Sequence, residues 1–487
     1  MKDQRCVLAI DQGTTGTTAV LVDGEGRIEA RAYREISQIY PRPGWVEHDP
    51  QEIWDSVVAT IAEVSGESRG KIEAVGITNQ RETTVVWRRG SGEPVGNAIV
   101  WQCRRTADLC RRLEPHAPLF RQRTGLPVDA YFSGTKLAWI LNNYELADAE
   151  DLCFGTIDSW LIWNLTGGRV HATDFTNASR TLLFNIRERR WDHELCRLFD
   201  VPEGILPAVK GSMDGFGAVE TVPGLEGVPI CGVAGDQQAA LFGQTCFEPG
   251  QAKNTYGTGC FLLMNTGRDF VLSAKGLVTT LAVEGTGNSC YALEGSIFIG
   301  GAALQWLRDE IGILTASRAS EEAANSVEDN AGVYMVPAFV GLGAPHWNMR
   351  ARGIITGLTR GANRNHIIRA ALESMAYQTR DVLTVMESEA GIEVGQLAVD
   401  GGAASNDFLM QFQADILDRP IARPAIIEST SLGAAFLAGL GSGFWKEPED
   451  LIQSRRVERI FRPAMEDAMR EMLLAGWERA LRQAVTE

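Results

Sequence analysis

Two glycine- and threonine-rich segments, each between strand-like runs, constrain the fold of this chain more than any other feature of its sequence. The first, Asp11–Gly16, follows the apolar run Cys6–Ile10, and the second, Tyr256–Cys260, precedes the run Phe261–Met264. Short apolar runs bounded by glycine are typical of buried strands. The repetition predicts an α/β chain with two similar halves, each beginning with a strand, a tight turn and a second strand.

The length of the chain also favours two domains. At 487 residues it exceeds the size of one ordinary hydrophobic core. Because the strand-turn-strand pattern restarts near residue 245, we predict an N-terminal domain over residues 1–244 and a C-terminal domain over residues 245–487.

Charge and cysteine content exclude several classes of protein. The chain has 62 acidic and 46 basic residues, a net charge of −16, which repels nucleic acid and anionic membranes. It has no signal-peptide pattern, no apolar run of membrane-spanning length, and nine scattered cysteines without a C-x-x-C pair. We therefore expect a cytoplasmic protein that binds no nucleic acid, has no structural zinc and does not insert stably into a membrane.

Helical periodicity predicts three helices of interest. The first begins after Asp49, the second covers Ile367–Glu389, and the last carries Met465, Met469 and Met472, for which core packing is the preferred interpretation.

A carboxylate follows the apolar run Ile230–Ala234. Gly235 allows the backbone to turn, and Asp236 and Gln237 come next. Ligands of α/β sheets usually lie at the carboxyl ends of strands, which favours a catalytic site here. Asp is also a favoured helix N-cap, so capping is an alternative role for Asp236.

The two glycine-rich turns can present backbone N–H groups and threonine hydroxyls to phosphate oxygens. Asp11 can hold a hydrated Mg²⁺, which prefers carboxylate and water. An ordinary hairpin is the alternative for either turn alone, but the two turns together favour phosphoryl transfer from a nucleotide. The segment Gly401–Asn406 also permits close approach of a flat ligand such as adenine, or is a plain strand-helix connection.

Arg81 and Glu82 follow another strand-like run. An isolated pair of this kind is usually solvated surface. With Trp101 and Tyr131 as aromatic walls, the pair would instead suit a polyol, which needs fixed donors and acceptors beside an apolar face.

Several motifs, in order along most of the chain, resemble those of glycerol kinases in the FGGY family of carbohydrate kinases. They are Pro43–Asp49, Thr78–Thr84, Trp101–Arg105, Thr176–Thr181, Gly235–Phe242, Tyr256–Asn265 and Val340–Pro345. The resemblance implies two ribonuclease-H-like domains of the actin/hexokinase type around an ATP cleft, MgATP-dependent phosphorylation of glycerol to sn-glycerol 3-phosphate, and a homo-oligomer, either a dimer or a tetramer.

The resemblance also implies roles for individual residues. Asp236 is the implied general base and Asp11 the metal-side carboxylate. The implied glycerol contacts are Arg81, Glu82, Trp101, Tyr131, Asp236, Gln237 and Phe261, and the implied ATP/ADP contacts are Thr14, Thr15, Thr258, Gly301, Gln305, Gly402 and Asn406. Thr18 stands where many family members have an arginine, so a changed nucleotide affinity, or a changed dependence of that affinity on conformation, is expected.

Two other interpretations make different predictions. A related sugar kinase acting on a pentulose would need a roomier site, and an actin-like scaffold protein would need no proton acceptor at Asp236.

The loop Pro223–Pro229 has an acid and no arginine, and no histidine occurs between His193 and His346. We therefore expect neither the fructose bisphosphate inhibition nor the phosphohistidine activation known among glycerol kinases.

Overall fold

A computed structural model describes residues 5–67, 70–144, 146, 149–348 and 350–485. The chain forms two compact units. The first contains Met1–Phe247, Thr279–Ala292 and Ser429–Arg455, and the second contains Glu248–Val278, Leu293–Glu428 and Arg456–Glu487. Each unit is therefore assembled from separate stretches of the chain.

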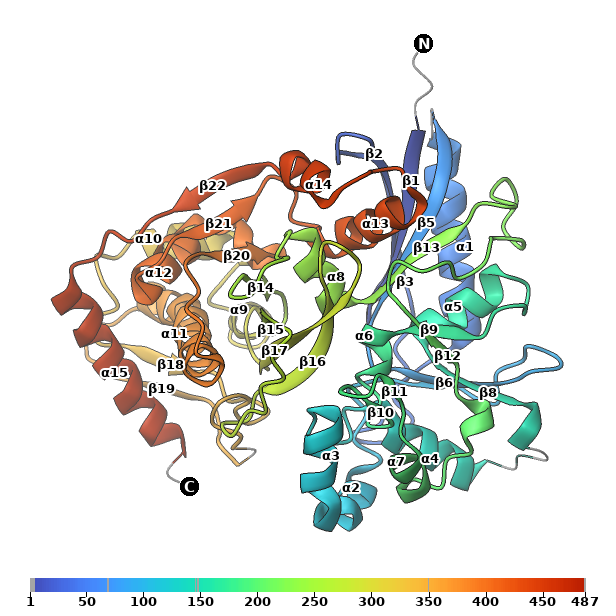
Figure 1. Ribbon diagram of the computed structural model, residues 1–487. Coiled ribbons are helices and arrows are strands. Elements are labelled where there is room, and N and C mark those ends of the chain that lie inside the picture. Colours follow the sequence, from blue (N-terminus) through green and yellow to red (C-terminus); the bar gives the residue numbers. More distant parts are fainter. Residues whose placement is uncertain (1–4, 68–69, 145, 147–148, 349, 486–487) are drawn as a thin grey trace. The chain divides into compact units, whose positions relative to one another are not determined.

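The first unit is built on a five-stranded sheet in the order β13-β5-β1-β2-β3 (Figure 1). Strands β1, β2 and β3 form an antiparallel meander, β5 is parallel to β1, and β13 is parallel to β5. The parallel arrangement brings the carboxyl ends of β1, β5 and β13 to one edge of the sheet.

Helices cover both faces of this sheet. Helix α1 lies over one face, where it buries Ile53, Val57, Ile61 and Val64 as predicted, and α13 lies over the other (Figure 1). Helix α13 approaches the strands closely, because a Cβ at Gly76 would lie 2.1 Å from the carbonyl oxygen of Ala434.

The elements of the first unit are β1 (Arg5–Gln12), β2 (Gly16–Asp23), β3 (Ile28–Glu35), β4 (Glu47–His48), α1 (Pro50–Glu67), β5 (Lys71–Asn79), β6 (Thr84–Arg88), β7 (Ala98–Ile99), α2 (Ala107–Leu113), α3 (Ala117–Thr124), α4 (Ser133–Asn143), β8 (Leu152–Thr156), α5 (Ile157–Leu165), β9 (Ala172–Asp174), α6 (Phe175–Ala178), β10 (Phe184–Asn185), β11 (Arg190–Trp191), α7 (His193–Leu198), β12 (Ala208–Lys210), β13 (Ile230–Gly235), α8 (Asp236–Gly243), α13 (Ser429–Ser442) and α14 (Pro448–Ser454).

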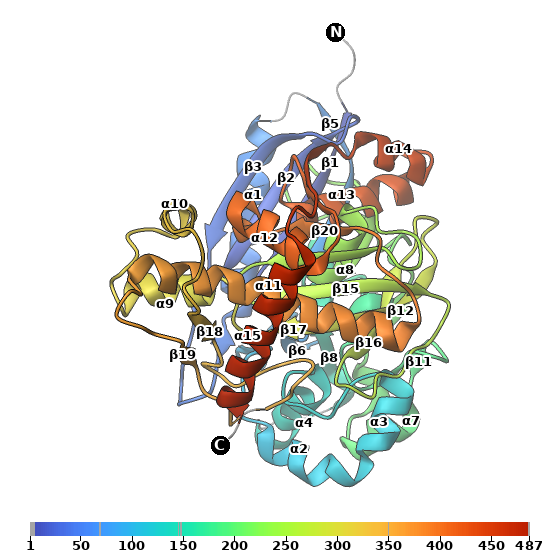
Figure 2. The same ribbon diagram turned by 90° about the vertical axis from the view of Figure 1, so that its left-hand side faces the viewer.

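The second unit repeats the central topology. Strand β14 is antiparallel to β15 and parallel to β20, which is parallel to β21, and β22 pairs with β21 in the antiparallel direction. Helix α15 crosses α11 (Figure 2), and the ring of Trp477 stacks on that of Tyr377 with centroids 5.2 Å apart. The order β15-β14-β20-β21 thus matches β2-β1-β5-β13 of the first unit.

The elements of the second unit are β14 (Ala252–Tyr256), β15 (Cys260–Gly267), α9 (Ala302–Asp309), α10 (Ser320–Asn325), β18 (Tyr334–Val336), β19 (Ile354–Thr356), α11 (Arg364–Ala390), β20 (Leu397–Asp400), α12 (Asp407–Leu417), β21 (Ile421–Pro424), β22 (Val457–Phe461) and α15 (Asp467–Val485). Two further strands, β16 (Val278–Val283) and β17 (Ser289–Ile297), contain residues of both units.

The core prediction for the methionines of the last helix is wrong for two of them. Met469 and Met472 are 45% and 56% exposed. Helix α15 buries a single stripe that begins at Leu473 and continues through Trp477; Met469 precedes this stripe, and Met472 lies outside it.

In the described part of the chain, no helix is both long and apolar enough to cross a membrane.

Candidate functional site

Hydrogen bonds to backbone carbonyls hold the turn after β1 in place. Gly13 donates to the carbonyl of Gly16 at 2.9 Å, and the Gln38 side chain donates to the carbonyl of Thr14 at 2.8 Å. A Cβ at Gly16 would lie 2.4 Å from the carbonyl oxygen of Arg34, which explains the glycine there. Thr14 is half-buried and Thr15 exposed, so the turn is fixed while its threonines reach the surface.

Asp11 and Asp236 form an acidic pair at the carboxyl ends of β1 and β13. Burial and the neighbouring negative charge of Asp236 raise the pKa of Asp11 to about 7, whereas a hydrogen bond from Ser431 and the positive charge of Arg31 oppose the rise. Two carboxylates that repel each other are a setting in which a divalent cation is favoured.

Asp236 is the first residue of α8, and Gly235 is the N-cap. The carboxylate accepts a hydrogen bond from the backbone of Gln237 at 2.7 Å and lies 3.1 Å from Nε of Arg81. Its side chain is 30% exposed, whereas that of Arg81 is 2% exposed. Asp236 is therefore not the cap residue, and its carboxylate is oriented but still accessible.

Arg81 and Glu82 are buried, so the surface interpretation of this pair is wrong. Glu82 adopts a left-handed backbone conformation, with φ of 62°, in the turn that follows β5. The guanidinium of Arg81 also donates to the side chain of Gln238 at 3.2 Å and lies 3.8 Å from the Glu82 carboxylate. Arg81 thus links the carboxylates of Glu82 and Asp236.

The two predicted aromatic residues of the first unit, Trp101 and Tyr131, pack against each other. The rings of Trp101 and Tyr131 meet edge to face with centroids 5.5 Å apart. The indole N–H of Trp101 donates to the hydroxyl of Thr14 at 2.9 Å. One predicted polyol residue, Trp101, is therefore in direct contact with one predicted phosphate residue, Thr14.

The remaining predicted residues lie in the second unit. Thr258 occupies the turn between β14 and β15, and its carbonyl accepts from the backbone of Ala302 at 3.0 Å. Gly301 is the N-cap of α9, and its backbone donates to Gly257 at 2.9 Å. Gln305 is exposed on α9. The turn and the start of α9 are thereby brought together.

The loop after β20 joins the same group. Gly401 has φ of 83°, and a Cβ there would lie 2.6 Å from the carbonyl oxygen of Tyr256, next to the turn. Gly402 follows, and Asn406 caps α12 and donates to the hydroxyl of Ser320 at 3.2 Å. Phe261, on β15, also belongs to this unit and is half-buried.

Three residues near the predicted site were not singled out individually from the sequence. Arg180 is fully buried and donates to the Glu82 carboxylate at 2.6 Å, Thr176 accepts from the backbone of Gly235 at 2.9 Å, and Ser431 contacts Asp11. Arg180 and Thr176 fall within a motif of the family resemblance, but no periodicity distinguishes a buried arginine from an exposed one.

Among the described residues, no group of three or more His, Cys, Asp and Glu side chains could enclose a metal.

Comparisons with known proteins agree with this geometry. The FGGY family of carbohydrate kinases matches twice, with its N-terminal domain over residues 6–243 and its C-terminal domain over residues 252–442. A glycerol kinase of Caldanaerobacter subterraneus subsp. tengcongensis is 57% identical, covering 98% of each chain. A glycerol kinase of Shewanella amazonensis is 54% identical, covering 99% of this chain and all of its own.

Solved structures show the same fold. The crystal structure of Plasmodium falciparum glycerol kinase with ADP has a TM-score of 0.93 and 36% identity, covering 99% of each chain. Gluconate kinase from Lactobacillus acidophilus has a TM-score of 0.87 at 22% identity, which bears on the fold alone. The predicted α/β class and actin/hexokinase-type fold are confirmed. On these matches, the chain belongs to the FGGY family of carbohydrate kinases.

Proposed function

We propose that this protein transfers the γ-phosphoryl group of ATP to glycerol, producing sn-glycerol 3-phosphate in glycerol catabolism. The observation that carries the proposal is the grouping in one unit of an accessible carboxylate, Asp236, a buried Arg81–Glu82 pair and the Trp101–Tyr131 aromatic pair. The relatives that are more than half identical over nearly their full length, and are named glycerol kinases, support the same substrate.

Glycerol would be held by matched polar groups against an aromatic surface. Arg81 can donate to one hydroxyl and Glu82 can accept from another, while Trp101 and Tyr131 cover the carbon chain. We also assign Gln237 and Phe261 to this site on the family resemblance. Since donors and acceptors are fixed, one end of the prochiral molecule is selected for reaction.

Asp236 would act as the general base. Its carboxylate accepts the proton of the attacking hydroxyl, whose oxygen forms a bond to the γ-phosphorus as the bond to the bridging oxygen breaks and ADP leaves. The contacts from Gln237 and Arg81 leave part of the carboxylate exposed, as a base requires. Positioning and charge stabilisation account for most of the acceleration in reactions of this class.

The nucleotide would be bound by the two glycine-rich turns and their neighbours. The assigned residues are Thr14, Thr15, Thr258, Gly301, Gln305, Gly402 and Asn406. Mg²⁺ usually keeps several waters and takes only one or two carboxylates besides substrate phosphates, so the Asp11 carboxylate beside Asp236 fits it. When bound, Mg²⁺ neutralises charge on the phosphates, while the N–H groups and hydroxyls of the turns orient them.

A coupled assay of ADP release with a panel of polyols and ketoses tests the proposal. We expect glycerol to give the highest kcat/KM. A pentulose as the best acceptor would favour a sugar kinase, and ATP consumption unaffected by any acceptor would favour a scaffold protein. The homo-oligomeric state and the cytoplasmic location stay predictions; light scattering of the purified protein checks the first of these.

A further inference from the structure

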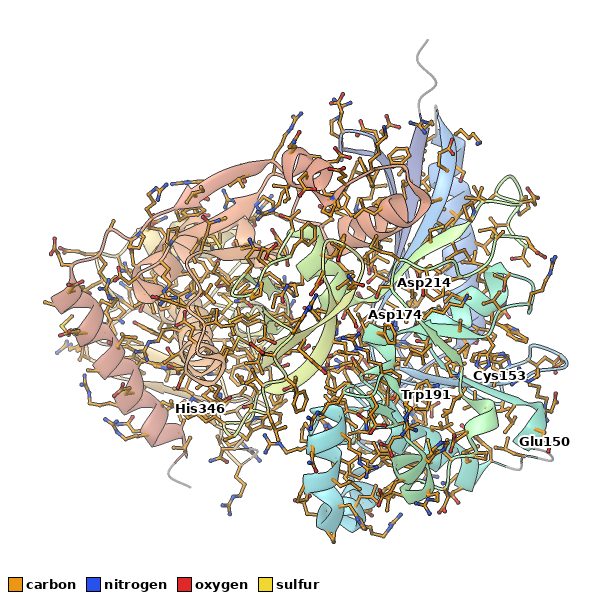
Figure 3. All side chains as sticks on the ribbon, viewed as in Figure 1. Glu150, Cys153, Asp174, Trp191, Asp214 and His346 are labelled. Carbon is orange, nitrogen blue, oxygen red and sulfur yellow. The ribbon has the colours of Figure 1, made fainter. Side chains whose placement is uncertain are left out.

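The segment Asp174–Arg180, which contains the short helix α6, is almost completely buried in the first unit. It begins at Asp174, labelled in Figure 3, where β9 ends and α6 starts. Its polar side chains contact three separate pieces of the predicted site. Buried polar groups are unfavourable unless each is hydrogen-bonded. The burial of so many polar side chains in one short segment therefore points to a role other than apolar packing.

The first contact supports the turn that carries Asp236. The hydroxyl of Thr176 accepts a hydrogen bond from the backbone N–H of Gly235 at 2.9 Å and donates to the Asp174 carboxylate at 2.7 Å. The same carboxylate accepts from Ser212 at 2.6 Å and from the backbone of Asn177 at 3.0 Å. The residue before Asp236 is therefore hydrogen-bonded to a buried polar network around Asp174.

The second contact supports the end of β5. The side-chain amides of Asn177 and Asn79 exchange two hydrogen bonds, at 3.0 and 3.1 Å. Asn79 is the last residue of β5 and lies two residues before Arg81. A reciprocal amide pair fixes both the distance and the orientation of the two backbones.

The third contact supports Glu82 itself. Nε of Arg180, which is fully buried, donates to the Glu82 carboxylate at 2.6 Å. The guanidinium lies 5.7 Å from the ring centroid of Tyr131 and 5.3 Å from that of Phe132. The carbonyl of Glu82 accepts from the hydroxyl of Ser133 at 3.1 Å. The carboxylate is therefore held at one oxygen from the side of this segment.

We propose that the segment Asp174–Arg180 is a positioning element that serves two functions at once: Thr176 orients the turn bearing Asp236, and Arg180 orients the Glu82 carboxylate toward the polyol. Thr176 and Arg180 are positioning residues, because each is argued to act through a neighbour. The inference rests on the proposed function and assigns a different effect to each end of the segment. Thr176 affects the chemical step, and Arg180 affects polyol binding.

The Thr176 end is tested by comparing Thr176→Val with Thr176→Ser. Valine has nearly the shape of threonine but cannot accept from Gly235, whereas serine keeps the hydroxyl. We expect Thr176→Val to lower kcat about tenfold or more by displacing Asp236, with glycerol KM little changed, and Thr176→Ser to stay near wild type. Equal kcat in the two variants, or a loss that appears only in the melting temperature, would overturn this half.

The Arg180 end is tested by a double-mutant cycle with Glu82→Gln. Removing a charged hydrogen bond in Arg180→Gln is expected to raise glycerol KM by about tenfold to hundredfold, with ATP KM unchanged. Because Arg180 acts through the carboxylate, Arg180→Gln should add little in the Glu82→Gln background. Effects that simply multiply would overturn the assignment. If Arg180→Gln does not fold, Arg180→Lys enters the same cycle.

Arg123→Gln is a matched control for the loss of an arginine ion pair. Arg123 lies in the same unit and pairs with Asp192 at 2.8 Å and Glu194 at 2.7 Å, none of which is assigned to the site. We expect it to change the melting temperature without changing glycerol KM. The cycle is run with the best acceptor of the wild-type enzyme, so an acceptor other than glycerol would refute the proposed substrate while the positioning role is still measured.

Discussion

Asp236 combines three properties that a base requires: a fixed backbone, an oriented carboxylate and partial exposure to solvent. In Asp236→Asn the side chain keeps an oxygen for the N–H of Gln237 but loses basicity. We expect kcat to fall by about 10²–10⁴-fold, the usual scale for a general base. The melting temperature and MgATP affinity are expected to stay close to wild type, and all three are measured on one preparation.

The same variant separates catalysis from helix capping. Gly235, and not Asp236, occupies the N-cap position of α8, so asparagine at 236 removes no cap. Near-wild-type kcat in a folded Asp236→Asn protein would contradict the catalytic role. A large drop in melting temperature would instead indicate that the Asp236 carboxylate, 3.1 Å from Nε of Arg81, mainly stabilises the fold.

Lys136 is a buried lysine close to the polyol residues. Burial lowers its pKa from 10.5 to about 7, against the opposing charge of Glu82, and its ammonium donates to the carbonyl of Tyr131. Between about pH 7 and pH 10 the unfolded chain holds a proton on this lysine that the folded chain has released. The contribution of Lys136 to the free energy of unfolding therefore increases as the pH rises through that window.

Unfolding of the wild type and of Lys136→Met at about pH 7 and about pH 9.5 checks this sign. We expect the free energy of unfolding of the wild type, relative to that of the variant, to be larger at the higher pH, because methionine cannot titrate. A difference between the two proteins that does not change with pH would show that Lys136 has an ordinary pKa in the folded state.

At the scale of elements, regular patterns were predictable and short polar connections were not. Helix α1 follows from apolar periodicity because it buries one face, and strands β1, β2 and β5 follow from apolar runs because both of their faces are buried. Helix α6 has only four residues, too few for any period to appear, and its position is fixed by polar contacts across the chain. The left-handed backbone of Glu82 likewise depends on tertiary contacts that the local sequence does not encode.

The contact between α8 and α13 depends on a glycine. A Cβ at Gly433 would lie 1.8 Å from the carbonyl oxygen of Ala239 on α8. Gly433→Ala must push the helices apart, so we expect a loss of about 1–3 kcal/mol in the free energy of unfolding. Since α8 begins at Asp236, kcat should fall as well. Denaturant titration and steady-state kinetics measure the two effects.

Gly66→Ala is the matched control, because an added Cβ near the end of α1 meets no atom within 4 Å. This substitution is expected to stabilise the protein slightly, by about 0.5–1 kcal/mol, since alanine favours the helix. Since helix propensity favours alanine at both positions, a comparable loss of stability in both variants would contradict the role given to the close approach of α8 and α13.

At the scale of the whole molecule, all nine cysteines are thiols, and eight are buried. Burial raises the pKa of the half-buried Cys110 to about 12. We expect the native enzyme to react slowly with thiol reagents and its melting temperature to be unaffected by reductant. Denaturation should expose nine reactive thiols; fewer than nine, restored by prior reduction, would reveal a disulfide and contradict the prediction.

The charge of the molecule bears on its control by anions. The net charge is −16, and the loop Pro223–Pro229 adds no arginine. The Glu226 carboxylate accepts from the backbone of Gly224 at 2.9 Å, so an acid already occupies the loop. Part of the loop lines a cavity of about 440 Å³ in which Arg5 and Lys71 are matched by Glu73 and Glu226. The local charge of that cavity is therefore balanced.

We accordingly expect that millimolar fructose bisphosphate does not inhibit the enzyme. A bisphosphate gains most from charge-assisted hydrogen bonds to arginine, and here it would meet the Glu226 carboxylate within an acidic molecule. Initial rates at subsaturating glycerol, measured across a concentration series at constant ionic strength, test this. A Glu226→Arg variant adds a guanidinium to the loop and is expected to become more sensitive than the wild type. Saturable inhibition of the wild type would contradict the prediction and would identify Arg5 and Lys71, in the cavity beside the loop, as the first groups to substitute.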